Sequence, residues 1–467
     1  MRPFPVTSSD AAWLRMEEPS NPMTITGVVG LGARLEREDL GRFLSERLAR
    51  FDRFAMRIEG VGTRTPTWVP DPDFDMDRHL FEADLPEPGG KAGLEALVSD
   101  LMSRPLSFAH SPWTFHLVHD VDDGEGHVGS ALVVRLHHVI GDGVALMHVF
   151  INAVDEYFDA GSPTRRERTP TRPLGQRIAS TLKGAGGEAV ELLTRPRHLG
   201  RRLKAAGGGV AALGGLLATR PDSTTSLKGT ASPDKRAAWT RSFSLRAVKD
   251  VSDRLDGKVN DVLMAVAGGA LRRYFQATGQ STDVTVRVAA PVNVRPLERA
   301  YELGNSFALF FVELPVSQPT VRQRLEAMKA TMDDAKASKE PAVVYAILQS
   351  IGKAPRWAHR MVVELFAQKA SGVLTNVPGP KEPLHIMGAP VTTMMFWVPQ
   401  AGDIGLGIAI LSLDGTVRVG VCTDAAYVDD PSALAQAFEA EFEAVAGELG
   451  VPITRALGPD ERGAEAG

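Results

Sequence analysis

Two adjacent histidines, His137 and His138, open an HHxxxDG pattern in which Asp142 is the acidic residue. The run Ser130–Leu136 (SALVVRL) predicts a strand before the pattern, and the apolar periodicity over Val144–Phe158 predicts a helix after it. An imidazole titrates near neutral pH, and a tight turn between a strand and a helix can hold it in one orientation. The pattern therefore indicates a general base at the mouth of a cleft, with the carboxylate bracing the turn.

Alternation along the predicted strand decides which histidine faces the chemistry. His138 shares a face with the apolar side chains of Leu132, Val134 and Leu136, whereas His137 points to the opposite face. A lone histidine on an apolar strand is more often a core residue, but the complete pattern favours a catalytic role for His138. A metal site is disfavoured because side chains on opposite faces of a strand cannot easily ligate one ion.

The HHxxxDG pattern resembles the signature of the CoA-dependent acyltransferase superfamily. Five further segments are similar to motifs of the bacterial wax ester synthase / diacylglycerol O-acyltransferase family: Ser8-Ser9-Asp10 followed by Asn21-Pro22-Met23, Lys258-Val259-Asn260-Asp261, Pro291-Val292-Asn293-Val294-Arg295, Leu303-Gly304-Asn305, and Thr375-Asn376-Val377-Pro378-Gly379-Pro380. The resemblance extends from about residue 8 to about residue 448. HHxxxDG alone indicates the superfamily, and the ordered set of motifs indicates the family.

The chain departs from the family pattern at three places. Pro112 stands before Trp113 where leucine is expected, and Asn293 and Thr375 stand where serine is more common. None of these changes removes a titratable group, so acyl transfer is still expected. The change at Pro112 bears on the preference for the acceptor, because the region around Trp113 is expected to form a wall of the substrate pocket.

The resemblance implies an α/β fold (an α+β sandwich). Two chloramphenicol-acetyltransferase-like lobes would be joined by a helical linker, with an active-site tunnel between them. His138 would act first as base and then as acid, and Asp142 would be a structural carboxylate within the motif that also contains His137 and Gly143. Arg295 is the candidate partner of Asp142, the alternative being an ordinary surface ion pair.

The remaining site candidates are polar residues within the other motifs. Asn305 and Asn376 are candidate donors to the oxyanion of a tetrahedral intermediate, although asparagine beside glycine or proline is more often a turn residue. Asn260 is expected to cap a helix over Asp261–Gln276, with Asp261 in its first turn. Trp113 is the candidate pocket-wall residue.

Composition excludes several classes of protein. Among 467 residues, 43% are hydrophobic and 23% are charged, which is typical of a globular chain. The only cysteine, Cys422, excludes an internal disulfide framework. Neither a signal peptide nor a transmembrane stretch is predicted, so a cytoplasmic enzyme is expected, peripheral at the inner membrane or at lipid inclusions. No metal and no cofactor other than the substrate acyl-CoA are expected, and the oligomeric state is left open.

The chain divides by composition into four parts. Residues 1–160 form the expected first lobe, 161–235 a basic amphipathic linker, 236–457 the second lobe and 458–467 a disordered tail. Residues 161–204 contain 11 Arg or Lys and 3 Glu, a balance of +8 in a chain of net charge −5. Two apolar stripes in the linker are consistent with connector helices and equally with a helix on an anionic membrane or lipid-droplet surface. No nucleic-acid motif accompanies the basic residues.

These features predict an O-acyltransferase that moves a long acyl chain from acyl-CoA to diacylglycerol, to a fatty alcohol, or to both. One alternative is an acyltransferase of the same superfamily that takes its acyl group from a carrier protein and esterifies a specialised metabolite. The other is a non-catalytic lipid-surface protein, against which the intact His138 and Asp142 speak.

Overall fold

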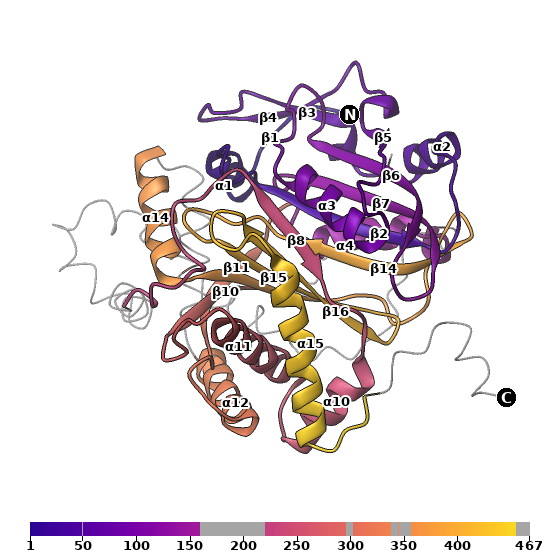
Figure 1. The fold of residues 1–467 in the computed structure, drawn as a ribbon. Coiled ribbons are helices and arrows are strands. Elements are labelled where there is room, and N and C mark those ends of the chain that lie inside the picture. The colour runs from indigo at the N-terminus through magenta and orange to yellow at the C-terminus, as the bar shows by residue number, and fades with distance from the viewer. Residues whose placement is uncertain (49, 159–219, 296–301, 338–343, 345–355, 454–467) are drawn as a thin grey trace.

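The computed structural model describes residues 1–48, 50–158, 220–295, 302–337, 344 and 356–453. Two mixed β-sheets lie at its centre, one built mainly from the first half of the chain and one from the second (Figure 1). The predicted linker lies largely outside the described residues, as does the predicted tail. In the parts that are described, no helix is long and apolar enough to cross a membrane.

The first sheet has six strands in the order β13-β14-β2-β7-β6-β5. The four strands from the N-terminal half are β2 (Thr24–Leu31), β5 (Leu80–Glu82), β6 (Trp113–Asp122) and β7 (Val128–His137). Its helices are α2 (Arg37–Leu48), α3 (Gly90–Met102), α4 (Gly143–Ala153) and α5 (Asp155–Phe158). The same half of the chain also contains α1 (Ser8–Met16) and a small sheet of β1 (Phe4–Pro5), β4 (Thr67–Pro70) and β3 (Met56–Glu59).

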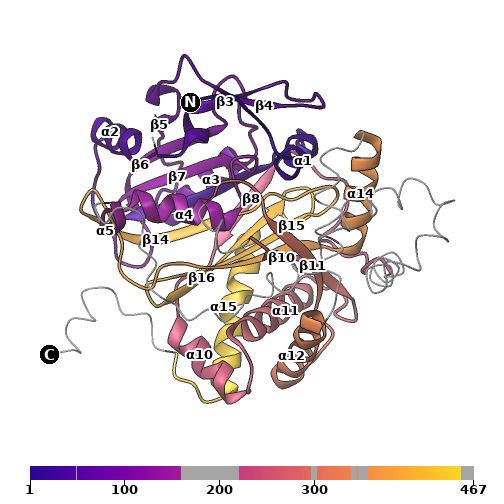
Figure 2. The ribbon, with the colours of Figure 1, turned by 180° about the vertical axis from the view of Figure 1, so that it is seen from behind.

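The second sheet runs β11-β10-β12-β15-β16-β8, with β9 also paired to β16. Its strands are β8 (Lys235–Trp239), β9 (Phe243–Ser244), β10 (Val286–Asn293), β11 (Phe307–Leu314), β12 (Gly372–Pro378), β15 (Leu406–Leu413) and β16 (Thr416–Asp424). Four helices gather on one side of this sheet (Figure 2): α10 (Leu245–Arg254), α11 (Val259–Ala277), α12 (Val321–Ala337) and α15 (Pro431–Glu448). The helix α14 (Arg356–Lys369) stands apart from them, beside α1.

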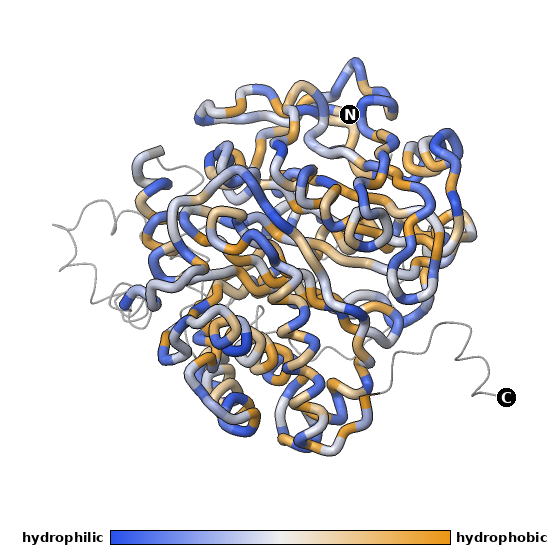
Figure 3. Tube along the Cα trace, viewed as in Figure 1, coloured by the Kyte–Doolittle hydropathy of each residue, from blue (hydrophilic) through white to orange (hydrophobic). Residues whose placement is uncertain are grey.

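The sheets do not follow the division of the chain into two halves. Strands β13 (His385–Ile386) and β14 (Ala389–Trp397) come from the second half, yet β14 pairs antiparallel with β2 of the first sheet. The Trp397 indole at the end of β14 donates to the Val421 carbonyl of β16 at 3.1 Å. Residues 1–160 therefore do not form the first sheet alone, and one of the hydrophobic clusters contains residues from both halves. Apolar segments also run through both sheets along the tube of Figure 3.

The helix after Gly257 begins two residues earlier than the sequence predicted. Lys258 is the N-cap residue and Asn260 lies within the first turn, so the expectation that Asn260 caps this helix is wrong. The reason is the side chain of Asp261, which accepts the Lys258 backbone N–H at 3.0 Å. The predicted place of Asp261 in the first turn is confirmed, and its carboxylate there opposes the positive end of the helix dipole.

Candidate active site

The HHxxxDG residues form the turn that joins β7 to α4. The strand ends at His137, and the His138 backbone N–H donates to the Met23 carbonyl at 2.8 Å. Asp142 is the N-cap of α4, because its Oδ1 accepts the Ala145 N–H at 3.0 Å, and Gly143 is the first helical residue. The carboxylate thus satisfies one of the unpaired N–H groups at the start of the helix.

A buried ion pair joins this turn to the second half of the chain. The Arg295 guanidinium donates to both oxygens of Asp142, at 3.2 and 2.8 Å, and to the Gly304 carbonyl at 2.7 Å. The Ser306 N–H donates to the same carboxylate at 2.8 Å. Asp142 and Arg295 are 5% and 8% exposed, so this is no surface pair, and the expected partnership is present. Gly304 has a φ of +110°, a conformation that favours glycine.

A second buried network holds the same turn from the other side. Asp10 of α1 is fully buried and accepts the backbone and side-chain N–H groups of Asn305, at 2.9 and 2.8 Å. It also accepts from Arg53 at 3.0 Å, and Arg53 in turn donates to the carbonyls of Val139 and Ile140. Sequence reasoning missed the role of Arg53, which lies outside every recognised motif.

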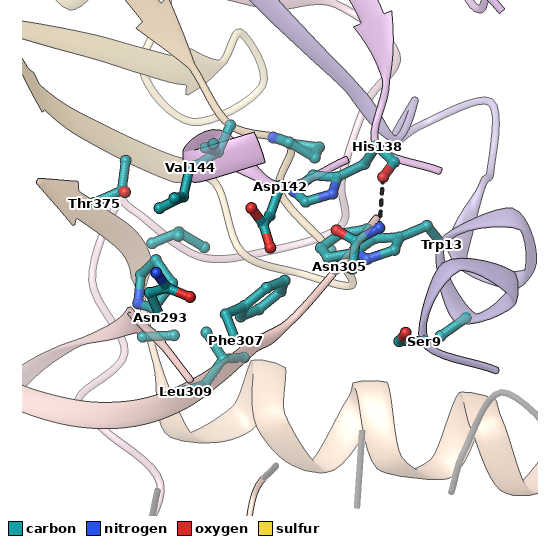
Figure 4. A pocket seen from close by; sticks show the side chains of 18 of the residues that line it. Ser9, Trp13, His138, Asp142, Val144, Asn293, Asn305, Phe307, Leu309 and Thr375 are labelled. Atoms are coloured by element: carbon teal, nitrogen blue, oxygen red, sulfur yellow. Dashed lines mark hydrogen bonds between the residues drawn. The ribbon is translucent and has the colours of Figure 1, made fainter. Parts of the chain in front are cut away.

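A cavity of about 650 Å³ lies between the two halves, with His138 in its wall (Figure 4). Most of its lining is apolar and comes from α1, α4, α14 and the strands of the second sheet. The expected apolar row of Leu132, Val134 and Leu136 is not among the lining residues, so that detail of the prediction is wrong. The cavity nevertheless separates the two histidines as predicted, since His138 lines it and His137 does not.

The cavity reaches into the second sheet through a split between two strands. Strands β10 and β12 pair at Val288 with Gly372 and at Ala289 with Val373. Farther along, β10 pairs with β11 on its other side, and β12 pairs with β15. The side chains of Asn293 and Thr375, from the two sides of this split, line the cavity opposite His138 (Figure 4). The sequence motifs that contain Asn293 and Thr375 did not predict this separation of the two strands.

His138 is held in a nearly water-free environment. It is 5% exposed, and the Trp13 indole stacks on its ring with centroids 3.7 Å apart and planes 9° apart. Burial lowers the pKa of His138 to about 4, and the nearby Asp142 carboxylate offsets this only in part. The imidazole is therefore neutral at pH 7, as a proton acceptor must be.

His137 has a structural environment. Its Nδ1 accepts the Val139 N–H at 3.0 Å, and its Nε2 lies 3.3 Å from the Glu17 carboxylate. Phe108 covers the ring edge-on at 5.0 Å between centroids. These contacts occupy the ring within the core, away from the cavity.

The polar candidates are placed unequally. Both side-chain N–H bonds of Asn305 are used, one by Asp10 and one by the His138 carbonyl at 2.8 Å, which speaks against Asn305 as an oxyanion donor. Asn376 lines the cavity and donates to Asn260 at 2.5 Å, so its amide keeps a second N–H.

Three candidates lie away from the cavity lining. Asn260 and Asp261 belong to the first turn of α11. Trp113 is 1% exposed, stacks on His79 and donates to the Phe54 carbonyl at 2.9 Å. Its expected role as a wall of this pocket is therefore wrong, because its side chain packs into the core of the first half.

Two aromatic residues near His138 were not predicted. Trp13 and Phe307 lie against each other and against His138, with ring centroids 5.9 Å apart for the Trp13–Phe307 pair and 6.1 Å for Phe307 and His138. Trp13 follows Asp10 by one helical turn, which is the only sequence signal that could have linked it to the site. Among the described residues, no cluster of three or more His, Cys, Asp or Glu side chains could hold a metal ion.

Solved structures share this architecture. A wax ester synthase/diacylglycerol acyltransferase from Marinobacter aquaeolei matches with a TM-score of 0.66 at 19% identity, over 97% of this chain and 100% of that chain. A trichothecene 15-O-acetyltransferase from Fusarium sporotrichioides matches with a TM-score of 0.61 at 12% identity, over 95% of each chain. The first condensation domain of the calcium-dependent antibiotic synthetase gives 0.60 at 14% identity, over 97% of each. The fold is therefore that of the CoA-dependent acyltransferases and condensation domains.

Family models identify the particular branch of this class. The model of the wax ester synthase/diacylglycerol acyltransferase catalytic domain matches residues 6–263, and that of the WS/DGAT C-terminal domain matches residues 303–446. The chain belongs to the wax ester synthase/diacylglycerol acyltransferase family and is an acyltransferase. A Mycobacterium tuberculosis protein named as a probable diacylglycerol O-acyltransferase is 27% identical over 93% of this chain and 94% of its own length.

Replacing Asp142 by asparagine is expected to lower stability and activity together. Asp142→Asn removes one charge of a buried pair and leaves Arg295 without its counterion, a change that costs about 3–5 kcal/mol in comparable sites. Thermal unfolding and acyl transfer measured on the same preparation check this. Asp39→Asn is the matched control, since Asp39 lies on the surface of α2 and pairs only with Arg42 among the described contacts. An inactive Asp142→Asn protein with an unchanged melting temperature would assign the carboxylate to proton transfer instead.

Proposed function

We propose that this protein transfers a long-chain acyl group from acyl-CoA to the hydroxyl of diacylglycerol, a fatty alcohol, or both. The observation that carries the proposal is a neutral, buried His138 in the wall of a mostly apolar cavity between the two halves of the molecule. An apolar cavity suits acyl chains, and a neutral imidazole suits an alcohol nucleophile. The name of the mycobacterial relative supports diacylglycerol as one acceptor.

The reaction needs only one residue to move the proton. His138 accepts the proton of the acceptor hydroxyl while its oxygen attacks the thioester carbonyl carbon. When the tetrahedral intermediate collapses, the carbon–sulfur bond breaks and the imidazolium returns the proton to the departing CoA thiolate. An ester and free CoA are formed, without a covalent acyl-enzyme, a metal or a further cofactor.

The oxyanion of the intermediate requires a hydrogen-bond donor. We assign this role to the amide of Asn376, or to the hydroxyl of Thr375 beside it, in place of Asn305. Both residues lie on β12 and line the cavity. Both side-chain N–H groups of Asn305 already donate to other acceptors, the Asp10 carboxylate and the His138 carbonyl.

A direct assay separates this proposal from the carrier-protein alternative. The purified protein is given palmitoyl-CoA with either dioleoylglycerol or hexadecanol, and both free-thiol release and the ester product are measured. Thiol release that depends on a lipid acceptor supports the proposal. Transfer only from an acyl carrier protein would contradict it and favour the alternative.

The two histidines are expected to differ sharply. His138→Ala should lower kcat by about 10³-fold, since general acid–base catalysis contributes about 10²–10⁴-fold. His137→Ala should keep measurable activity, because His137 contacts Glu17 and Phe108 outside the cavity. Thermal unfolding of both variants separates lost chemistry from lost folding. Equal loss of activity in two folded variants would contradict the assignment of the base.

The pH dependence follows from the lowered pKa of His138. The base is active only when neutral, so a pKa of about 4 keeps it active well below pH 6.5. We expect kcat/KM to stay constant from about pH 8 down to about pH 5 and to fall below that, whereas an exposed histidine would lose activity near pH 6.5. A pH profile at saturating acceptor, with His138→Ala as the baseline, measures this. An acid limb near pH 6.5 would contradict the buried state.

We also propose that the enzyme works at an anionic lipid surface, such as the inner membrane or a lipid inclusion. The basic segment 161–204 lies outside the described residues, so its composition alone supports this proposal. Each basic residue near an anionic surface contributes about 1 kcal/mol of attraction, which salt screens.

Removing five of these charges is expected to weaken binding to anionic liposomes. The variant replaces Arg195, Arg197, Arg201, Arg202 and Lys204 by glutamine, and co-sedimentation is measured at low and high salt. Activity on detergent-dispersed acceptor should be unchanged. Unaltered liposome binding would contradict this proposal and favour the alternative that the segment only connects the two halves.

A further inference from the structure

One face of α1 forms part of the cavity wall. Its lining residues follow helical spacing: Ser9, Ala12, Trp13 and Met16. The start of the helix is fixed, because the Thr7 side chain accepts the Asp10 N–H at 3.2 Å and the buried Asp10 carboxylate holds Arg53 and Asn305. The position of Trp13, one turn after Asp10, is therefore tied to the same network that holds the turn after β7.

The Trp13 ring lies flat on the ring of His138. The centroids are 3.7 Å apart and the planes differ by 9°, so the indole covers one whole face of the imidazole. Figure 4 shows Trp13 reaching from α1 to the side of His138. A flat stack leaves the ring edge open for proton transfer while it fixes the plane of the ring and keeps water from the covered face.

The stack favours the charged form of His138 more than the neutral form. A cation above an indole face is attracted by the negative face of the ring, most strongly where water is excluded. The imidazolium exists only after His138 has taken the acceptor proton, so this attraction acts on the transition state and the intermediate. An interaction that is stronger there than in the ground state raises kcat rather than lowering KM.

We propose that Trp13 is a positioning residue for His138, which fixes the plane of the imidazole and stabilises its transient positive charge. The inference rests on the proposed role of His138 as the base. It assigns to α1 a function in the reaction beyond lining the cavity. The contacts of Asp10 hold the helix in place, and Trp13 on that helix holds the ring of His138.

Two variants separate the stacking from simple packing. Trp13→Phe keeps an aromatic face, whereas Trp13→Leu keeps apolar volume without one. We expect kcat to fall by about tenfold to thirtyfold in Trp13→Leu and by about threefold in Trp13→Phe, with KM for acyl-CoA nearly unchanged. Because the indole favours the imidazolium, its loss in Trp13→Leu lowers the pKa of His138, and the acid limb of the pH profile moves to lower pH.

Trp357→Ala controls for the loss of a tryptophan. Trp357 is 60% exposed on α14 and does not line the cavity, so this variant should keep full activity and an unshifted acid limb. The inference is overturned if Trp13→Leu keeps its kcat and its acid limb. It is also overturned if the activities of Trp13→Leu and Trp13→Phe only follow their melting temperatures. Should Trp13→Leu not fold, an unchanged kcat in Trp13→Phe overturns it.

His138→Ala distinguishes failure of this inference from failure of the proposed function. If the His138→Ala protein is active, His138 is not the base, and the proposed role of Trp13 is wrong as well. If the His138→Ala protein is folded but inactive while the Trp13→Leu protein is fully active, only the proposed role of Trp13 is contradicted.

Discussion

The site depends on one buried ion pair, that of Asp142 with Arg295. Taking both charges out of water is costly, and their attraction offsets that cost only with good geometry and additional hydrogen bonds. Here the guanidinium meets both carboxylate oxygens, and the N–H groups of Ala145 and Ser306 bind the same carboxylate. Such a pair adds little net stability, but it fixes one arrangement of the two halves. That arrangement puts His138 opposite the split between β10 and β12.

Burial dominates the protonation of His138, although the Asp142 carboxylate of the same pair acts against it. An isolated carboxylate about 4 Å away would favour the imidazolium by about 4 kcal/mol at an effective dielectric constant near 20. The Asp142 carboxylate, which is paired with Arg295, acts in that direction, but burial outweighs it. Desolvation therefore prevails and lowers the pKa of His138 to about 4. The stacked Trp13 attracts the imidazolium, but with a pKa of about 4 His138 is still neutral at pH 7 before the reaction begins.

The exchange of β14 makes the cavity a shared structure rather than a gap between two independent lobes. Strand β14 completes the first sheet, while its Trp397 binds the backbone of β16 and packs beside Trp239 at the edge of the second sheet. Helix α1 adds a further connection through Asp10 and Asn305. The walls of the cavity are thus joined at several points, which is what the orientation of a single base requires.

The sequence by itself determined helices and strands near the site and which of the two adjacent histidines faces the cavity. The period of two in the strand before His137 separated the two histidines, and the sequence patterns located α4 and α11, because these patterns depend on neighbours within a few residues. Only the tertiary structure decided the contacts between distant parts of the chain. Both side-chain N–H groups of Asn305 donate to Asp10 and His138, and Trp113 packs in the core. Trp13 covers His138, and β14 joins the first sheet. Those contacts join residues as far apart in the chain as Thr26 and Trp397, and no periodicity of side chains encodes which distant surfaces meet.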